Sequence, residues 1–468
     1  MMKRRDIQKR IVFVDLDAMM PSDHLLRRID EAIDFGFIYE ISEPYYSKLG
    51  RGSVDPVTLV KMLLIGYLYG IKSERRLEQE VRLNSAYRWF CGLELDEPVP
   101  DHSVFSQNRR RRFSDGKVFR EIFNAIVAQC MEKGLITGGD VVSDGTFIPA
   151  NVAWGSRDDS VKAIEKSAVS YLEELDRELQ NTPGYKPPER AVEERNIVKS
   201  ATDRDAGYIS HANKKGIGYV AEISVDTAFG LVTGVDVVPA NRRESDIILR
   251  HLKRQIEENG IPIKNLALDA GYDVGAVHRG LELLGITGYV SLRGYHNCPI
   301  KKGFGYLPAE DVFVCPRGRH LAFRRLVYKK RNCNYFRAYE ADREGCKGCP
   351  DWPTCSPDNG RCRIHASSFY PSYYANQQRN TTPEYKRMKR LRSIWSEGTF
   401  SVLKRERNMS RARKRGISKM AEECLMAASA LNLKRMANVI CIAFLETASA
   451  LLLRRYSSVL VNMLVVVA

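Results

Sequence analysis

The chain has 468 residues, of which 44% are hydrophobic and 28% are charged, as in a soluble globular protein of about two or three domains. Its 73 Lys and Arg residues outnumber 57 Asp and Glu residues, and the net charge of +16 favours a polyanionic partner, nucleic acid before membrane. The opening MMKRRDIQKRIVFVDLD has only a short apolar run before an acid, which excludes a signal peptide.

The C-terminal segment 437–468 is apolar. Ala437 to Leu453 carries Glu446 and is short for a membrane span of about 20 residues. We therefore expect a buried helix followed by a tail, and no membrane partner. The 11 cysteines are then expected in a reducing compartment, where clustered cysteines indicate metal rather than disulfides.

Residues 1–135 are predicted to form a helical DNA-binding domain. Residues 54–135 carry apolar residues at helical spacing, first in VDPVTLVKMLLIGYLYGI and then in SERRLEQEVRLNSAYRWFCGL. After the turn DEPVPDHS, the arginines Arg109, Arg110, Arg111 and Arg112 fall at a predicted helix start. They are either a solvated charge run or contacts to DNA phosphates, which the forked guanidinium suits. Compact helices with a basic run fit a helix-turn-helix type module.

The pattern changes to strands at Asp140. DVVSDGTFIPANVAW predicts a β-strand with Asp144 in its middle, where an acid is rare unless it is paired or binds metal. The alternative is a turn at the Asp-Gly step. Residues 156–216 are predicted to be a charged insertion, with a helix from Val161 to Gln180. A hairpin, GYVAEISVD and GLVTGVDVVPA, and a helix from Glu244 to Asn259 follow.

The next segment, IKNLALDAGYDVGAVHRGLELLGITGYVSLR, reads strand, loop, helix, strand. Asp269 ends the first of these strands, the usual place for a site in an open α/β sheet, and Gly271 lets the chain turn closely. Across residues 136–295 the order is that of a ribonuclease-H-like domain. The expected fold class is therefore α+β or α/β: a helical N-terminal domain, then a ribonuclease-H-like mixed sheet with helices.

A cysteine-rich insertion, residues 296–375, interrupts this predicted sheet domain. Cys346, Cys349 and Cys355 form a CxxC-x5-C group, and a structural zinc ion needs four such ligands in a tetrahedron. The candidates for the fourth ligand are Cys315, Cys333, Cys362 and His320, of which Cys315 is our choice. The alternative is a set of reduced cysteines in a β-rich insertion.

The catalytic core resumes at 376–436 with a basic helix from Met388 to Gly416. The residues Leu391, Ile394, Trp395 and Val402 are expected to form one buried stripe, and Arg390, Glu397 and Lys404 a second stripe beside it. The alternative is a surface helix with paired charges.

Asp144, Asp269 and Glu397 form a set that suits phosphodiester chemistry. Two divalent ions about 4 Å apart can activate the attacking oxygen and stabilise the leaving oxygen. A few carboxylates suffice to hold Mg²⁺, which keeps part of its water shell. Lys404, two helical turns beyond Glu397, would lie near the phosphates. No P-loop, GxSxG or HExxH motif offers another chemistry.

These motifs together resemble a bacterial insertion-sequence DDE transposase with an InsH-like N-terminal domain. The resemblance rests on the N-terminal helices with DHSVFSQNRRR, on SDGTFIPAN, SATDRDAGYISHANKKGIGY and LALDAGYD, and on IWSEGTFSVLKRERNMSRARKRG followed by LMAASALNLKR. It covers most of residues 50–436, in the order of the family.

The resemblance implies DNA strand cleavage and transfer at terminal inverted repeats, by a bacterial cytoplasmic enzyme that acts on double-stranded DNA as a homodimer. It makes Asp144, Asp269 and Glu397 the ligands of two Mg²⁺ or Mn²⁺ ions, and Lys404 a DNA contact. The family pattern places an Arg where this chain has Ser393, so Arg392 and Arg390 are rivals for that role. The alternatives are a decayed or domesticated DNA-binding protein and a nuclease without strand transfer.

Overall fold

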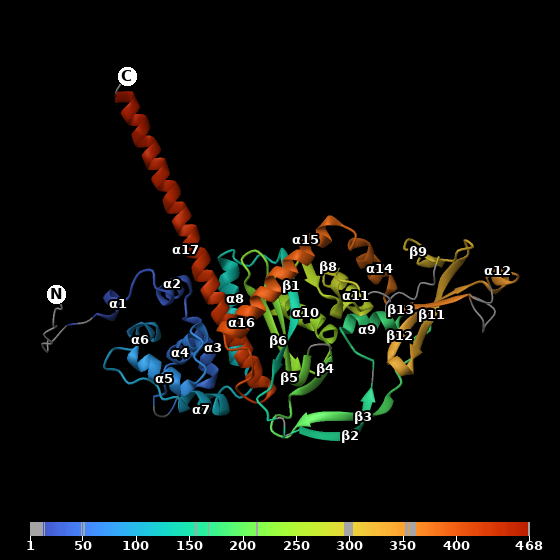
Figure 1. The fold of residues 1–468 in the computed structure, drawn as a ribbon, viewed down its shortest axis with the longest axis horizontal. Helices are drawn as coiled ribbons and strands as arrows, with labels where there is room; N and C mark the ends of the chain where they lie inside the picture. Colours follow the sequence, from blue (N-terminus) through green and yellow to red (C-terminus); the bar gives the residue numbers. More distant parts are fainter. Residues whose placement is uncertain are drawn as a thin grey trace, which may run out of the picture. The chain divides into compact units, whose positions relative to one another are not determined.

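The structure is a computed structural model that describes residues 13, 15–47, 49, 52–153, 155, 157–166, 168–211, 214–293, 303–351, 355 and 362–466. The chain forms two compact units (Figure 1). The first comprises residues 1–126, 406–408 and 429–468, and the second comprises residues 127–405 and 409–428.

The first unit is helical. Its helices, with α8 running on into the second unit, are α1 (Leu16–Met19), α2 (Leu25–Ala32), α3 (Phe37–Ser42), α4 (Pro56–Leu68), α5 (Glu74–Leu83), α6 (Ser85–Cys91), α7 (Ser103–Arg111) and α8 (Lys117–Glu132). Asp55 caps α4 by accepting from the Thr58 N–H at 2.9 Å, and Pro56 occupies the first helical position. The second expected helix is two helices, because Asn84 ends α5 and its side chain caps α6. The helical prediction for residues 54–135 is otherwise confirmed.

The short segment 406–408 completes the end of α4 in the same unit. The buried Arg407 guanidinium donates to the Leu68 carbonyl at 2.6 Å, and the Asn408 side chain donates to the Gly66 carbonyl at 3.3 Å. Carbonyls in the last turn of a helix lack partners within the helix, so these contacts satisfy the end of α4. Arg407 therefore serves the core of this unit.

The main sheet of the second unit has the order β4-β5-β1-β7-β8, and β6 also pairs with β5. Its strands are β1 (Asp140–Pro149), β4 (Gly207–His211), β5 (Lys214–Asp226), β6 (Val232–Pro239), β7 (Asn265–Leu268) and β8 (Thr287–Val290). Strands β1, β7 and β8 are parallel, whereas β5 runs antiparallel to both β1 and β6. The predicted hairpin and the predicted strand-loop-helix-strand segment are confirmed.

Helices cover both faces of β1. Successive side chains of a strand point to opposite faces. On one face, Ser143 of β1 bonds Ser224 of β5, which bonds His251 of α10 (Ile248–Asn259). On the other face, Asp144 meets Arg392 of α15 (Pro383–Arg392). Helices α11 (Gly275–Leu283) and α14 (Tyr370–Arg379) pack on each other and on β8.

The charged insertion is mainly a hairpin. Strands β2 (Arg157–Lys166) and β3 (Ala191–Ser200) pair along their whole length, from Arg157 with Ser200 to Lys166 with Ala191. The predicted helix from Val161 to Gln180 is therefore wrong in its first half, and only α9 (Glu173–Gln180) is helical. The cause is long-range: β3 supplies a hydrogen-bonding partner to a segment whose charge pattern alone suits a helix.

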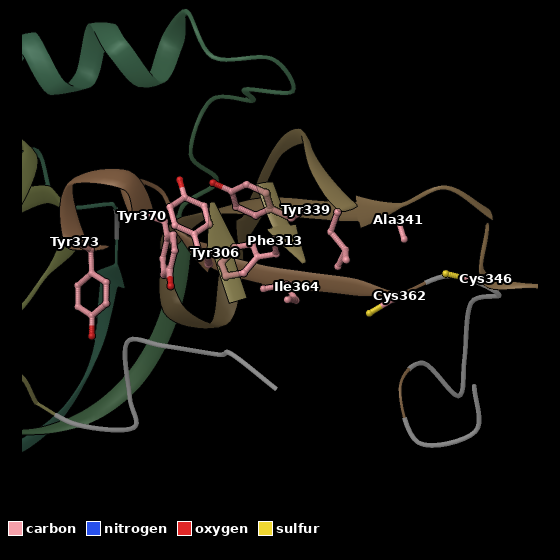
Figure 2. Packing of buried hydrophobic residues seen from close by; sticks show 11 residues of the cluster. Tyr306, Phe313, Tyr339, Ala341, Cys346, Cys362, Ile364, Tyr370 and Tyr373 are labelled. Atoms are coloured by element: carbon pink, nitrogen blue, oxygen red, sulfur yellow. The ribbon is translucent and has the colours of Figure 1, made fainter. Parts of the chain in front are cut away.

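The cysteine-rich insertion contains an antiparallel sheet of order β13-β12-β11-β10-β9. Its strands are β9 (Gly305–Leu307), β10 (Val312–Val314), β11 (His320–Lys329), β12 (Asn334–Ala341) and β13 (Arg363–Ser367). Figure 2 shows its buried aromatic cluster, in which the Phe313 ring lies 4.9 Å from Tyr339 and 5.0 Å from Tyr370. Cys346 and Cys362 lie at one end of this cluster.

Five cysteines gather near that end. Cys315 and Cys355 pack against the cluster that contains Cys346 and Cys362, and the Sγ atoms of Cys355 and Cys362 are 3.1 Å apart. Cys349 follows Cys346 in a turn closed by a 3.3 Å backbone bond. Cys333 instead follows β11 at the opposite end of the β11–β12 hairpin, and His320 is exposed beside Glu310. Cys333 is therefore a poor fourth ligand, whereas Cys315 and Cys362 lie with the other cysteines and His320 adjoins Cys315 across the β10–β11 pair.

Helix α17 (Ile417–Val466) runs from the second unit into the first. Its first turn is held by Asp203, which accepts from the Gly416 N–H, and by Asp205, which accepts from the Ile417 N–H. The segment predicted as a buried helix and a tail continues α17 as one helix, and Ile440 and Ile442 are exposed where burial was predicted. The stretch Ile417–Ile442 is long and apolar enough for a membrane span, but 61% of its most apolar window is buried, as in a core helix, so this is weak evidence for a span.

Candidate active site

Asp144 lies in the middle of β1, not in a turn, so the alternative of a turn at the Asp-Gly step is wrong. Its Oδ1 accepts from the Gly145 N–H at 2.9 Å, and its Oδ2 accepts from Arg392 Nη1 at 2.8 Å. Burial and the charge of Asp269 raise the pKa of Asp144 to about 6, although Arg392 acts in the opposite direction. A second positive charge beside this carboxylate would favour its charged form and lower its pKa.

Asp269 follows β7 directly and caps the 3₁₀ turn Ala270–Tyr272, where its Oδ1 accepts from the Gly271 N–H at 2.6 Å. Strands β1 and β7 are parallel, with Val142 opposite Ala267. Asp144 and Asp269 each stand two residues further along, so the register places them side by side. Two distant aspartates thus meet at the carboxyl end of β7, as their predicted positions required.

Glu244 is a third carboxylate at this place, and the sequence reasoning missed it. It begins a 3₁₀ turn (Glu244–Asp246) before α10. A Cβ added to Gly145 would lie 2.5 Å from Glu244 Oε1, and one added to Gly271 would lie 3.4 Å from Glu244 Oε2. The two glycines therefore leave the space that Glu244 fills. A glycine shortly after each aspartate was the available signal in the sequence.

Glu397 ends a π turn (Ser393–Glu397) that contacts β1 and connects α15 to α16 (Gly398–Glu406). Its carboxylate is exposed and accepts from Ser393 Oγ at 3.4 Å. π turns inside α-helices are frequent at functional sites. The structure therefore places Glu397 on the helix that packs on β1, and the side chain that reaches Asp144 from this helix is Arg392.

The predicted apolar stripe on this helix is wrong. The buried residues are Met388, Ser396, Thr399 and Leu403, and Ile394 is 52% exposed. Small polar side chains face the sheet because the helix packs closely on it. Trp395 lies over Gly230, where an added Cβ would be 2.1 Å from its ring. This contact fixes the π turn against the β5–β6 connection.

The predicted charged stripe is interrupted as well. A π turn contains one residue more than an α turn, so Arg390 is rotated away from the face that carries Glu397. Arg390 is exposed, Lys404 is half-buried, and Arg392 contacts Asp144. Of the two rivals for the cation that precedes Glu397, Arg392 is the one beside a catalytic candidate.

The four arginines end α7 rather than begin a helix, which corrects the predicted position. Arg109 pairs with Glu74 at 2.6 Å, and the Arg112 guanidinium lies 4.3 Å from the Tyr46 ring centre. These two side chains stabilise the helical unit. Arg110 and Arg111 are exposed, so they are the members of the run available for phosphate contacts.

The donor set of Asp144, Asp269 and Glu244 fits a hard divalent cation, because it consists of carboxylate oxygens that repel one another. Neither these three acids nor Asp144, Asp269 and Glu397 bring their ligand atoms within 4.8 Å of one another in the described chain. There, the group of ligand atoms within 4.8 Å of one another is Glu78, Asp101 and His102. That group has a structural role, since Glu78 accepts from the His102 N–H at the start of α7.

Replacing Asp144 with Asn is expected to stabilise the protein at pH 8 in buffer without divalent ions, by about 3 kcal/mol. The folded-state pKa of about 6 lies above the usual 3.8, so the folded state loses stability as the pH rises through 6. The Asn variant does not lose stability in this way. The difference in the free energy of unfolding between the variant and the wild type should therefore vanish near pH 4. Urea unfolding of both proteins at pH 4, 6 and 8 checks this, and a pH-independent difference would contradict it.

Two protein-family models match segments of the chain. The family described as Transposase domain (DUF772) matches residues 14–111, and the family described as Transposase DDE domain matches residues 314–437. A comparison with curated proteins gave no significant match.

Three solved structures are similar to the chain at low identity. A piggyBac transposase synaptic complex with hairpin DNA is 8% identical, with a TM-score of 0.32, over 88% of this chain and 78% of that one. A Mos1 transposase paired-end complex with the left transposon end is 11% identical, and a Mos1 mariner paired-end complex with Mn is 10% identical. Their TM-scores are 0.16 and 0.17, over 52% of this chain and 61% of those chains.

The family matches cover the helical N-terminal region and the segment that carries the cysteines and Glu397. The chain therefore carries one segment that matches a DUF772 transposase domain and another that matches a transposase DDE domain.

Proposed function

We propose that the protein is an insertion-sequence transposase that cuts DNA at terminal inverted repeats and transfers the freed strand to target DNA, with divalent metal ions. The observation that carries this proposal is the pair Asp144 and Asp269, which lie side by side on β1 and directly after β7. The DDE match supports it independently.

The sheet supports a ribonuclease-H-like catalytic core. Taking β1, β5, β6, β7 and β8 as its five strands, the spatial order is third, second, first, fourth, fifth. Asp144 belongs to the first strand and Asp269 directly follows the fourth, with the Glu397 helix packed on β1. Two of the proposed acids thus come from the sheet and its strand end, and the third comes from a helix that contacts the sheet.

Asp144, Asp269 and Glu397 would hold two Mg²⁺ or Mn²⁺ ions, and Glu244 would add a further oxygen donor. Bound there, such ions activate the attacking oxygen and stabilise the leaving one. Arg392 holds Asp144 in one orientation through its 2.8 Å ion pair. Lys404 would contact a phosphate of the bound strand, and a DNA phosphate could also recruit Arg392.

The helical unit would hold the DNA outside the catalytic core. Arg110 and Arg111 are exposed at the end of α7, and neighbouring arginines suit contacts to successive phosphates. Two such chains, one at each end of the element, would bring the ends together. The partner is therefore double-stranded DNA, with the protein acting as a homodimer in the bacterial cytoplasm.

The test is incubation of the purified protein and Mg²⁺ with a duplex taken from the DNA that flanks its coding region. Cleavage that leaves a 3′-hydroxyl, followed by joining to a target plasmid, is the expected result. Binding without cleavage under any divalent ion would indicate a DNA-binding relative that has lost activity. Cleavage without joining would indicate a nuclease.

A structural zinc ion is the second proposed cofactor. Cys346, Cys349 and Cys355 would supply three thiolates, and either Cys315 or Cys362 the fourth. Cys315 is supported by the Arg319 N–H that points to its sulfur at 3.4 Å, and Cys362 by its closeness to Cys355. Such a zinc site would hold together the segments at the end of the insertion sheet that lies opposite Cys333.

Zinc analysis of the purified protein is expected to give one ion per chain. Cys346→Ser should lose the ion and lower the melting temperature of the insertion, because metal binding and folding are coupled. Comparing Cys315→Ser with Cys362→Ser identifies the fourth ligand, and Cys333→Ser is the matched control that should retain zinc. A wild-type protein purified without chelators that contains no zinc would contradict the site.

A further inference from the structure

We infer that Glu222 is a positioning residue that fixes Asp144 and Asp269 relative to each other, through one hydrogen bond to Ser143 and another to Tyr272. This inference rests on the proposed function, because it assigns the two aspartates to a metal site. Glu222 lies outside that metal site, and its side chain is on the face of the sheet opposite the Asp144 side chain.

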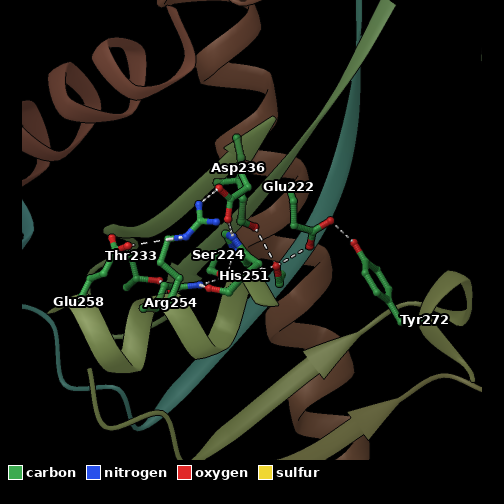
Figure 3. Close-up of polar contacts among 11 residues, drawn as sticks. Glu222, Ser224, Thr233, Asp236, His251, Arg254, Glu258 and Tyr272 are labelled. Atoms are coloured by element: carbon green, nitrogen blue, oxygen red, sulfur yellow. Dashed lines mark hydrogen bonds and ion pairs between the residues drawn. The ribbon is translucent and has the colours of Figure 1, made fainter. Parts of the chain in front are cut away.

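Glu222 bridges the two segments that carry the aspartates. It belongs to β5 and is fully buried. Ser143 Oγ donates to its Oε1 at 2.7 Å, and the Tyr272 hydroxyl donates to its Oε2 at 2.6 Å (Figure 3). The two oxygens of one carboxyl group are thus divided between β1 and the turn after β7.

Both partners are close to an aspartate along the chain. Ser143 precedes Asp144, and its side chain points to the opposite face of β1. Tyr272 ends the 3₁₀ turn that Asp269 caps. Any shift of β1 along β7, or any rotation of that turn, would stretch one of the two bonds. Glu222 therefore constrains the separation of the two aspartates without touching either.

The side chains around Glu222 are themselves held. Ser224 Oγ donates to Ser143 Oγ at 3.1 Å and lies 2.8 Å from His251 Nε2, and His251 Nδ1 lies 2.8 Å from Asp236. Figure 3 shows this chain of contacts leading from Tyr272 through Glu222 to α10. Glu222 is thus linked by hydrogen bonds through Ser143 and Ser224 to α10, the helix that covers this face of the sheet.

Stability alone is a poor reason for a carboxyl group in this position. Burial raises the pKa of Glu222 well above its ordinary value, and an apolar side chain of similar volume would avoid that cost. Hydrogen bonds to the groups behind a metal ligand commonly change metal affinity or activity by about 10- to 100-fold. Glu222 joins the two segments that carry the proposed metal ligands, so we expect it to influence metal affinity in the same way.

Manganese binding to the full chain, followed by electron paramagnetic resonance without DNA, tests the inference. Tyr272→Phe removes one bond of the bridge, and we expect it to raise the Mn²⁺ dissociation constant about tenfold or more. Glu222→Leu should do the same, whereas Glu222→Gln, which keeps the shape and can still bond both hydroxyls, should bind close to wild type. Thermal melting confirms that each variant is folded.

Thr233→Val is the matched control. Thr233 is buried in the same network and donates to Gln255 at 2.8 Å, but it bonds neither aspartate-bearing segment. We expect it to lower the melting temperature and leave Mn²⁺ affinity unchanged. Equal Mn²⁺ affinity for Tyr272→Phe and wild type would overturn the inference, as would a Glu222→Gln variant as weak as Glu222→Leu. A wild-type protein that binds no Mn²⁺ would instead remove the proposed function itself.

Discussion

Asp269→Asn and Glu397→Gln are each expected to reduce Mg²⁺-dependent DNA cleavage at least about a thousandfold, equivalent to about 4 kcal/mol of barrier. Each change keeps the shape of the side chain but removes the negative charge that would hold a divalent ion. Asp269 is fixed by the Gly271 N–H, so its amide should stay in place. DNA binding, measured by gel shift in Ca²⁺, should remain near the wild-type level.

Glu384→Gln is the matched control, since Glu384 lies on α15, the helix that precedes the π turn, and pairs only with the neighbouring Arg387 among the contacts described for it. It should cleave like wild type. A Glu397→Gln variant that cleaves within tenfold of wild type would show that this acid is not a metal ligand. Glu244 would then be the third carboxylate to test.

Gly230→Ala is expected to destabilise the protein by about 3 kcal/mol and to reduce cleavage at least about tenfold. Gly230 has a φ of +75°, and its added Cβ would lie 2.1 Å from the Trp395 ring. Trp395 belongs to the π turn that carries Glu397, so moving the ring moves the turn. Urea unfolding and the cleavage assay measure the two effects.

Gly260→Ala separates the backbone effect from the contact. Gly260 ends α10 with a φ of +66°, and its added Cβ would meet nothing within 4 Å. It should cost only about 1 kcal/mol and leave cleavage unchanged. Equal effects of the two substitutions would mean that the Trp395 contact does not position the π turn.

The aspartates could be predicted because their signals are local. An acid inside an apolar strand and an acid at a strand end stand out in the sequence, and the order of hairpin, helix and strand indicates which strands adjoin. Strand β1 indeed lies between β5 and β7. Helix caps such as Asp55 are local in the same way, and the helical N-terminal region follows from them.

The remaining features depend on contacts between distant segments. The first half of the expected helix from Val161 becomes a strand because β3 pairs with it. The π turn and the Trp395–Gly230 contact decide which face of the Glu397 helix is buried, and neither follows from periodicity. Glu244 comes near the aspartates, and Glu222 comes near the segments that carry them, only after the sheet has formed, although Gly145 and Gly271 mark the space that Glu244 uses.

The fourth zinc ligand illustrates the same limit. The spacing of the cysteines allowed Cys315, Cys333, Cys362 and His320. The hairpin of β11 and β12 moves Cys333 to the far end of the sheet, while Cys362 reaches Cys355. Strand pairing therefore separates Cys333 from the other candidates.

The most direct test of the catalytic account is a crystal structure of the protein with cleaved end DNA and Mn²⁺, with the ions located by their anomalous scattering. We expect two peaks about 4 Å apart, bound by Asp144, Asp269 and Glu397, with Arg392 released from Asp144 or shared with a phosphate. Peaks held by other residues, or a Glu397 carboxylate still turned to solvent beside two bound ions, would contradict it.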